Sequence, residues 1–241
     1  MTNILDRVAK SRSGSFQPAN PDEFLALRLA RSLGTPEAAA QFALLMSQYG
    51  SEHMLAAYAR TLKVARLTSD LPGIFRRELE DPKTRGWPGA KLGLTALAIE
   101  RRCMAVAVFT GQHLEWALCR HLSSQPAKAE ESAVAFVEEI LSEYQRTESA
   151  ALESVAISQV QRSVLREAVV RTLRGNGIAL WEASKADVLS GFGQPEPKNR
   201  KDVRATVLRM WPQLPTGRGQ MPAADAAALG LFVQTERLFK H

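Results

Sequence analysis

The sequence predicts an α/β fold in which a mixed β-sheet is flanked by helices, preceded by an α-helical N-terminal region. Three observations predict it. Up to about residue 85 the apolar residues recur only at helical spacing. Short β-compatible runs then follow one another from residue 94. After these runs, helix-like and strand-like segments alternate, as expected for parallel strands joined by helices.

Residues 1–85 form the predicted helical region. Asn20-Pro21-Asp22-Glu23 is typical of a helix start, with Asn at the cap, Pro at the first position and acids in the first turn. The expected helices cover 21–33, 35–49 and 51–65. Residues 81–93 hold two prolines and three glycines and are the predicted linker. We therefore expect a second domain over 94–241.

The first strands of that domain are predicted over 95–100, 103–109 and 113–122. Joined by short turns, they indicate an antiparallel meander. A single helix over 90–109 is the alternative, because the periodicity there does not exclude it. Arg101-Arg102 is also unusual for a tight hairpin turn, which favours residues such as Asn-Gly. We favour the meander.

The rest of the domain alternates. We expect helices over 126–148, 160–174, 198–211 and 222–239, and strands over 150–157 and 178–183. A strand that returns to the sheet after a helix runs parallel to its neighbour. The later strands are therefore predicted to be parallel, and the whole sheet to be mixed.

The net charge of +6 is unevenly placed along the 241 residues. Residues 91–159 carry 6 Lys and Arg against 9 Asp and Glu, whereas residues 160–241 carry 13 against 7. An acidic middle beside a basic end fits an acid-lined site in a surface that attracts phosphate.

The two cysteines exclude a disulfide scaffold and a thiolate zinc site. No apolar run approaches the ~18 residues of a membrane span, so we expect a cytoplasmic protein.

Three stretches carry a family resemblance. They are Leu97-Ala98-Ile99-Glu100, then Ser184–Gly193 followed by Lys198–Val203, and Pro222–Leu231. An apolar strand ends in a carboxylate, a Lys-containing segment reaches Gly-x-Gly, and a final helix opens with Ala and Asp. This order resembles the RNase H-like superfamily, in particular RuvC-type Holliday junction resolvases, over about residues 94–240. The resemblance implies an RNase H-like mixed sheet.

It also implies a metal-dependent endonuclease that acts on DNA, including branched or Holliday-junction DNA. In that family, carboxylates of the first strand, the fourth strand and the last helix hold divalent cations. The matching positions are Glu100, Glu153 and Asp225, as both catalytic residues and ligands of Mg²⁺ or Mn²⁺. Hard cations prefer such oxygen ligands, and two of them activate water for phosphodiester cleavage. The resemblance further implies DNA as partner and a homodimer.

Basic residues near these stretches are the predicted nucleic-acid contacts. Several gather at one expected helix start, where they suit phosphate groups. The set is Arg101, Arg102, Lys185, Lys198, Arg200, Lys201 and Arg204.

The sequence departs from the family pattern in ways that keep other functions open. Glu100 stands where the family has Asp before a glycine turn, and Pro222 stands where a second acid is usual. Glu148 competes with Glu153 for the fourth-strand position. The first alternative is a catalytically inactive RNase H-fold module that binds nucleic acid or a protein partner. The second is an unrelated helical interaction protein, which the single helix over 90–109 would permit.

Overall fold

The computed structural model describes Pro21 and Phe24, both helical, and most of the chain from residue 93 onward. The described ranges are 93–110, 113–144, 147–155, 158–192, 199–217 and 219–240, without the side chains of 235 and 237–240. The helices expected over 1–85 therefore lie outside the described residues, apart from those two positions. The chain divides into two compact units, Leu92–Val233 and Met1–Lys91 with Gln234–His241. The sheet and the helices around it belong to the first of these units, except for residues 234–240 at the end of the last helix.

Five strands form one mixed sheet in the order β3-β2-β1-β4-β5. Their bounds are β1 Gly93–Ile99, β2 Cys103–Thr110, β3 His113–His121, β4 Thr147–Glu153 and β5 Ala179–Ala183. β2 pairs antiparallel with β1 and β3, whereas β1 with β4, and β4 with β5, are parallel. The predicted meander and mixed sheet are confirmed. The alternative of one helix over 90–109 is wrong.

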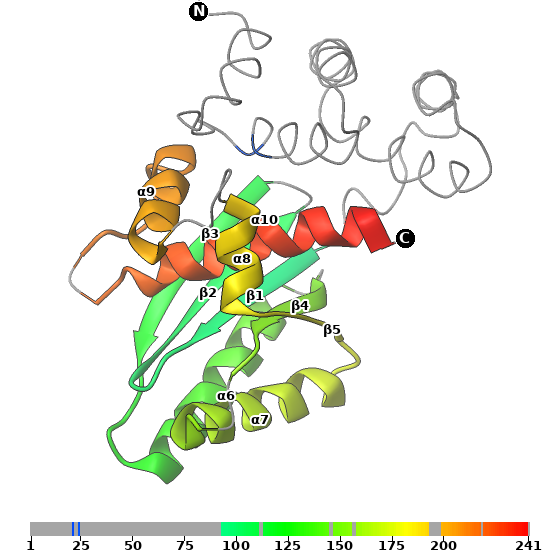
Figure 1. The fold of residues 1–241 in the computed structure, drawn as a ribbon. Helices are drawn as coiled ribbons and strands as arrows, with labels where there is room; N and C mark the ends of the chain where they lie inside the picture. The colour runs from blue at the N-terminus through cyan, green and yellow to red at the C-terminus, as the bar shows by residue number, and fades with distance from the viewer. Residues whose placement is uncertain are drawn as a thin grey trace, which may run out of the picture. The chain divides into compact units, whose positions relative to one another are not determined.

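Five helices accompany the sheet in the described residues (Figure 1). They are α6 Pro126–Glu143, α7 Val160–Gly175, α8 Lys185–Phe192, α9 Arg200–Met210 and α10 Pro222–Lys240. α6 ends earlier than expected, so that β4 begins at Thr147 and its hydroxyl bonds that of Thr95 across the sheet (3.0 Å). α8 was not expected. Ser184 and Asp187 form a reciprocal cap at its start, which is a local signal the periodicity does not show.

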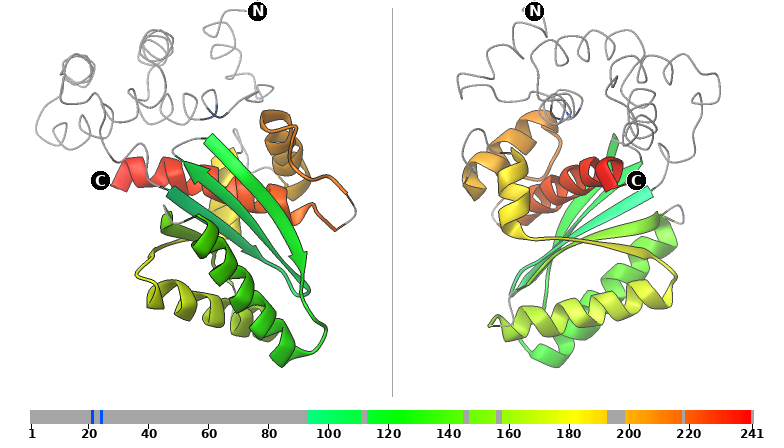
Figure 2. Two further views of the ribbon diagram at one scale, coloured as in Figure 1. Left: turned by 180° about the vertical axis from the view of Figure 1, so that it is seen from behind. Right: turned by 45° about the vertical axis from the view of Figure 1, so that its right-hand side comes forward.

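The helices lie on both faces of the sheet. α6 and α7 cover one face, and α8 and α10 lie across the other (Figure 2). Leu97 and Ile99 belong to the core under α6 and α7, while Ala98 lines a pocket with residues of α10. Successive residues of a strand point to opposite faces of the sheet. Because helices cover both faces, β1 is buried along its whole length.

The turn from β1 to β2 explains how two arginines are tolerated there. The amide of Glu100 donates to the carbonyl of Cys103 (2.9 Å). No non-glycine residue in the described chain has a positive φ, so this turn does not need the left-handed residues that Asn-Gly provides. Glu100 is thereby held directly after β1, at the edge of the sheet.

Among the described helices, none combines the length and the hydropathy that crossing a membrane would require.

Candidate functional site

The three predicted acids come from three separate elements. Glu100 follows β1, Glu153 ends β4, and Asp225 lies in the first turn of α10. Because β1 and β4 are parallel neighbours, Glu100 and Glu153 leave the sheet at the same edge. Glu153 and Asp225 line one pocket of about 40 Å³. Glu100 is connected to Asp225 through a shared arginine, Arg200. The structure thus brings the three acids into one neighbourhood.

Two arginines of α9 hold the Asp225 carboxylate. The Nε atoms of Arg200 and Arg204 donate to Oδ1, at 3.1 and 2.9 Å. Their terminal nitrogens donate to Oδ2, which makes both pairs bidentate. The two arginines are four residues apart on one helix and therefore share a face. Asn199 fixes the start of that helix by accepting the amide of Asp202 (3.0 Å).

Arg200 also donates to Oε1 of Glu100, so one guanidinium links the end of β1 to α10. The hydrogen bonds and charge of Asp225, and then those of Glu100, raise the pKa of Arg200 above its ordinary value against the opposing effect of burial. Arg200 is therefore charged throughout the working pH range. The three side chains are about one third exposed or less.

Arg162 is a site residue that the sequence analysis missed. Its terminal nitrogen lies 3.6 Å from Oε1 of Glu153, and both side chains are less than one fifth exposed. Its Nε donates to the last carbonyl of β1, that of Ile99 (2.7 Å). Arg162 lies in the first turn of the helix that follows β4. The topology could have indicated this residue, because the helix that follows β4 starts at the edge of the sheet where β4 ends with Glu153.

The residues present do not fit the divalent cation that the family resemblance implies. Each oxygen of Asp225 already accepts two N–H groups, which uses the lone pairs that a metal would need. Glu100 and Glu153 are likewise paired with guanidinium groups. In the described part of the chain, no group of three or more His, Cys, Asp and Glu is arranged to hold a metal ion. The three acids converge, and each of them is paired with an arginine side chain.

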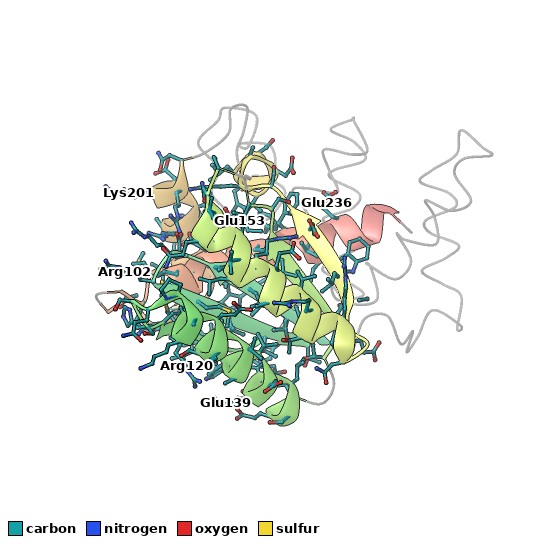
Figure 3. All side chains as sticks on the ribbon, turned by 90° about the horizontal axis from the view of Figure 1, so that it is seen from below. Arg102, Arg120, Glu139, Glu153, Lys201 and Glu236 are labelled. Carbon is teal, nitrogen blue, oxygen red and sulfur yellow. The ribbon has the colours of Figure 1, made fainter. Side chains whose placement is uncertain are left out.

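The other predicted basic residues lie on the surface around this site. Arg101, Arg102, Lys185 and Lys201 are exposed, and Lys185 also lines the pocket. Arg102 and Lys201 lie toward the same side of the unit in Figure 3. Arg101 donates to the amide oxygen of Gln161 at the start of α7 (3.0 Å). Lys198 lies outside the described residues. Of the predicted set, Arg200 and Arg204 contact the acids.

Comparison with known proteins finds similarity in structure alone. No family model matches the sequence, and no curated protein matches it closely. The structure of Thermus thermophilus RuvC matches with 17% identity and a TM-score of 0.49, over 61% of this chain and 96% of that one. The structure of T. thermophilus RuvC in complex with a Holliday junction substrate matches with 18% identity and a TM-score of 0.51, over 62% and 96%.

At this identity the second match supports the architecture and not the chemistry. The mixed five-stranded sheet with helices on both faces is the RNase H-like α/β fold, as in RuvC.

Proposed function

We propose that this protein is a nucleic-acid-binding module of RNase H-like fold that does not cleave its ligand. The observation that supports the proposal most directly is the pairing of all three acids with arginines. A site whose carboxylates are neutralised from within repels neither phosphate nor a nucleic-acid backbone. Among the acids of the family pattern, none keeps an unpaired carboxylate for a metal.

The charges around the site support phosphate as its ligand. Three arginines neutralise the three acids, and four further basic residues, Arg101, Arg102, Lys185 and Lys201, are exposed nearby. Two acids lie on the same helices as Lys185 and Lys201, namely Asp187 on α8 and Asp202 on α9. Their carboxylates contact Ser184 and Asn199 at the helix starts. The net charge of these residues is therefore positive. Exposed cations of this kind contact the phosphate backbone without reading the base sequence.

Branched DNA is the proposed ligand class. The solved RuvC complex contains a Holliday junction, and the fold of that protein is similar to this one. The junction in that complex suggests the ligand class, and the exposed basic residues of this chain supply the binding surface. A homodimer, which a two-fold junction would suit, and a cytoplasmic location remain predictions.

Fluorescence anisotropy with a labelled four-way junction, and with a linear duplex of equal length, tests the binding. We expect the affinity for the junction to fall steeply between 50 and 200 mM salt, by roughly tenfold or more if only a few phosphates are contacted. R101Q/R102Q should weaken binding and reduce the slope of log K against log salt by up to about 2, since each lost phosphate contact removes ~0.9.

The matched control is R171Q/R174Q, which removes two exposed arginines of α7, away from its first turn. That variant should bind as the unmodified protein does. Absence of binding at low salt, or an equal loss in both variants, would contradict the proposal.

A metal-dependent endonuclease is the second candidate, favoured by one observation. The three acids, remote in sequence, do gather at one edge of the sheet. Such an enzyme would need Arg200 and Arg204 to leave Asp225. Incubation of the junction with Mg²⁺, Mn²⁺ or EDTA separates the two functions. We expect binding without nicking; nicking that requires metal and is lost in D225N would establish the endonuclease instead.

A further inference from the structure

The Asp225 carboxylate and its two arginines form the most completely satisfied polar group in the site. Its two oxygens accept four N–H bonds, two from Arg200 and two from Arg204. The Asp225 side chain is only 14% exposed, so these bonds are formed largely out of water. A carboxylate with about four acceptor positions has no capacity left for another ligand.

Arg200 extends this arrangement to a second element. Its terminal nitrogen donates to Glu100 as well as to Asp225, so a single planar cation lies between the end of β1 and the start of α10. A bridging divalent cation would have to stand between the same two carboxylates. Arg204 adds a second positive charge to Asp225. The third acid, Glu153, is paired separately with Arg162, whose other bond to the Ile99 carbonyl fixes its position.

We propose that the guanidinium groups of Arg200 and Arg204 substitute for a divalent cation, so that this carboxylate cluster is a metal-free clamp that joins β1, α9 and α10. The corollary is that removing both arginines turns the cluster into a divalent-metal site. The clamp forms in the protein without nucleic acid, so it does not depend on nucleic-acid binding.

The chemistry of the carboxylates that would be left unpaired without Arg200 and Arg204 supports the corollary. Without the two arginines, Glu100 and Asp225 would face each other beside a pocket that Glu153 also lines. Carboxylate oxygens are the ligands that Mg²⁺ and Mn²⁺ prefer, with waters that complete the coordination. With the arginines present, a dication meets two fixed positive charges at the same oxygens. Coulomb repulsion at such short range opposes binding strongly even where the effective dielectric is high.

Mn²⁺ titration followed by electron paramagnetic resonance, without any nucleic acid, tests the proposal. We expect R200Q/R204Q to bind one Mn²⁺ at least about tenfold more tightly than the unmodified protein does. Adding D225N to that double variant should abolish the gain, because Asp225 supplies the central carboxylate. R171Q removes an arginine that pairs with Glu130 away from the site, and it should leave Mn²⁺ binding unchanged.

Two outcomes would overturn the proposal. One is a folded R200Q/R204Q variant whose Mn²⁺ affinity equals that of the unmodified protein. The other is tight, saturable Mn²⁺ binding by the unmodified protein that D225N removes. The second measurement decides the matter even if circular dichroism shows that the double variant is unfolded. In that case, an unmodified protein whose melting temperature is the same in Mn²⁺ and in EDTA supports the clamp. Neither readout involves DNA, so failure of DNA binding is a separate result.

Discussion

At the scale of single residues, the burial of a charge pair decides how much its loss costs. Asp225 and Glu139 each accept a bidentate pair of bonds from arginine. The Asp225 side chain is 14% exposed, whereas that of Glu139 is 54% exposed. Removing one member of a buried pair leaves the other charge desolvated and unpaired, while an exposed partner returns to water.

We therefore expect D225N to lower the free energy of unfolding by about 2–3 kcal/mol, a figure discounted for the partial exposure of Arg200 and Arg204. The matched variant E139Q should lower it far less. Urea denaturation followed by circular dichroism measures both. Equal losses would show that burial does not control the strength of the Asp225 cluster.

The two cysteines provide a second prediction at this scale, and it concerns pH. A hydrogen bond from the Cys119 thiol lowers the pKa of Cys103 below its ordinary 9.0, against the effects of burial and of the Glu100 charge. The same bond and burial raise the pKa of Cys119. Since the thiolate is the nucleophile, Cys103 should be alkylated by iodoacetamide at pH values below those of an ordinary thiol.

In C119A the pH midpoint of Cys103 alkylation should move upward, because the donor is lost. C119S keeps a hydroxyl donor and should restore the lower midpoint. Mass spectrometry of the alkylated peptides over pH 6–10 reads these midpoints. An unchanged midpoint in C119A would disprove the role of the hydrogen bond.

At the scale of elements, α10 packs against β2 through a glycine. A Cβ atom at Gly230 would overlap the ring of Phe109. That ring is fully buried and meets Trp211 edge-on, with centroids 5.7 Å apart. The ring therefore has little room to move aside, and close approach of the helix to the sheet requires glycine here.

G230A should destabilise the protein by about 1–3 kcal/mol, even though alanine favours helix, because overpacking outweighs helix propensity. G175A is the control, since a Cβ there meets nothing within 4 Å. It should leave stability unchanged or raise it by up to about 1 kcal/mol. Thermal unfolding of the two variants measures the difference. A stable G230A would mean that α10 does not pack closely on Phe109.

At the scale of the molecule, the site exists because of the strand order. β1 lies between β2, which follows it directly, and β4, which returns only after β3 and α6. This order places the ends of β1 and β4 side by side, although Glu100 and Glu153 are 53 positions apart in the chain. α9 and α10 then bring Arg200, Arg204 and Asp225 to the same edge. Folding of the sheet must therefore precede or accompany assembly of the clamp.

Much of this arrangement was predictable. The four long helices follow from local periodicity and from residues that start or end helices. The helix over 222–239, for example, follows from its alanine-rich opening and its proline. The meander was the favoured of two interpretations, because the periodicity over 90–109 also permits a helix. The sequence analysis missed α8 because eight residues contain too few helical turns for the periodicity to be recognised. Ser184 and Asp187 nevertheless form a capping pattern at its start.

The sequence by itself determined the α/β class and favoured the meander, because these depend on patterns within short windows. The resemblance to RuvC-type resolvases supplied the candidate acids Glu100, Glu153 and Asp225. Only the tertiary structure decided which cation meets which acid. Arg200 was expected to contact phosphate, and Arg162 was not expected at all, yet both neutralise site carboxylates. A long basic side chain adopts many conformations, and its partner is fixed only when distant elements pack. The physical difference is between local backbone preference and pairing across the fold.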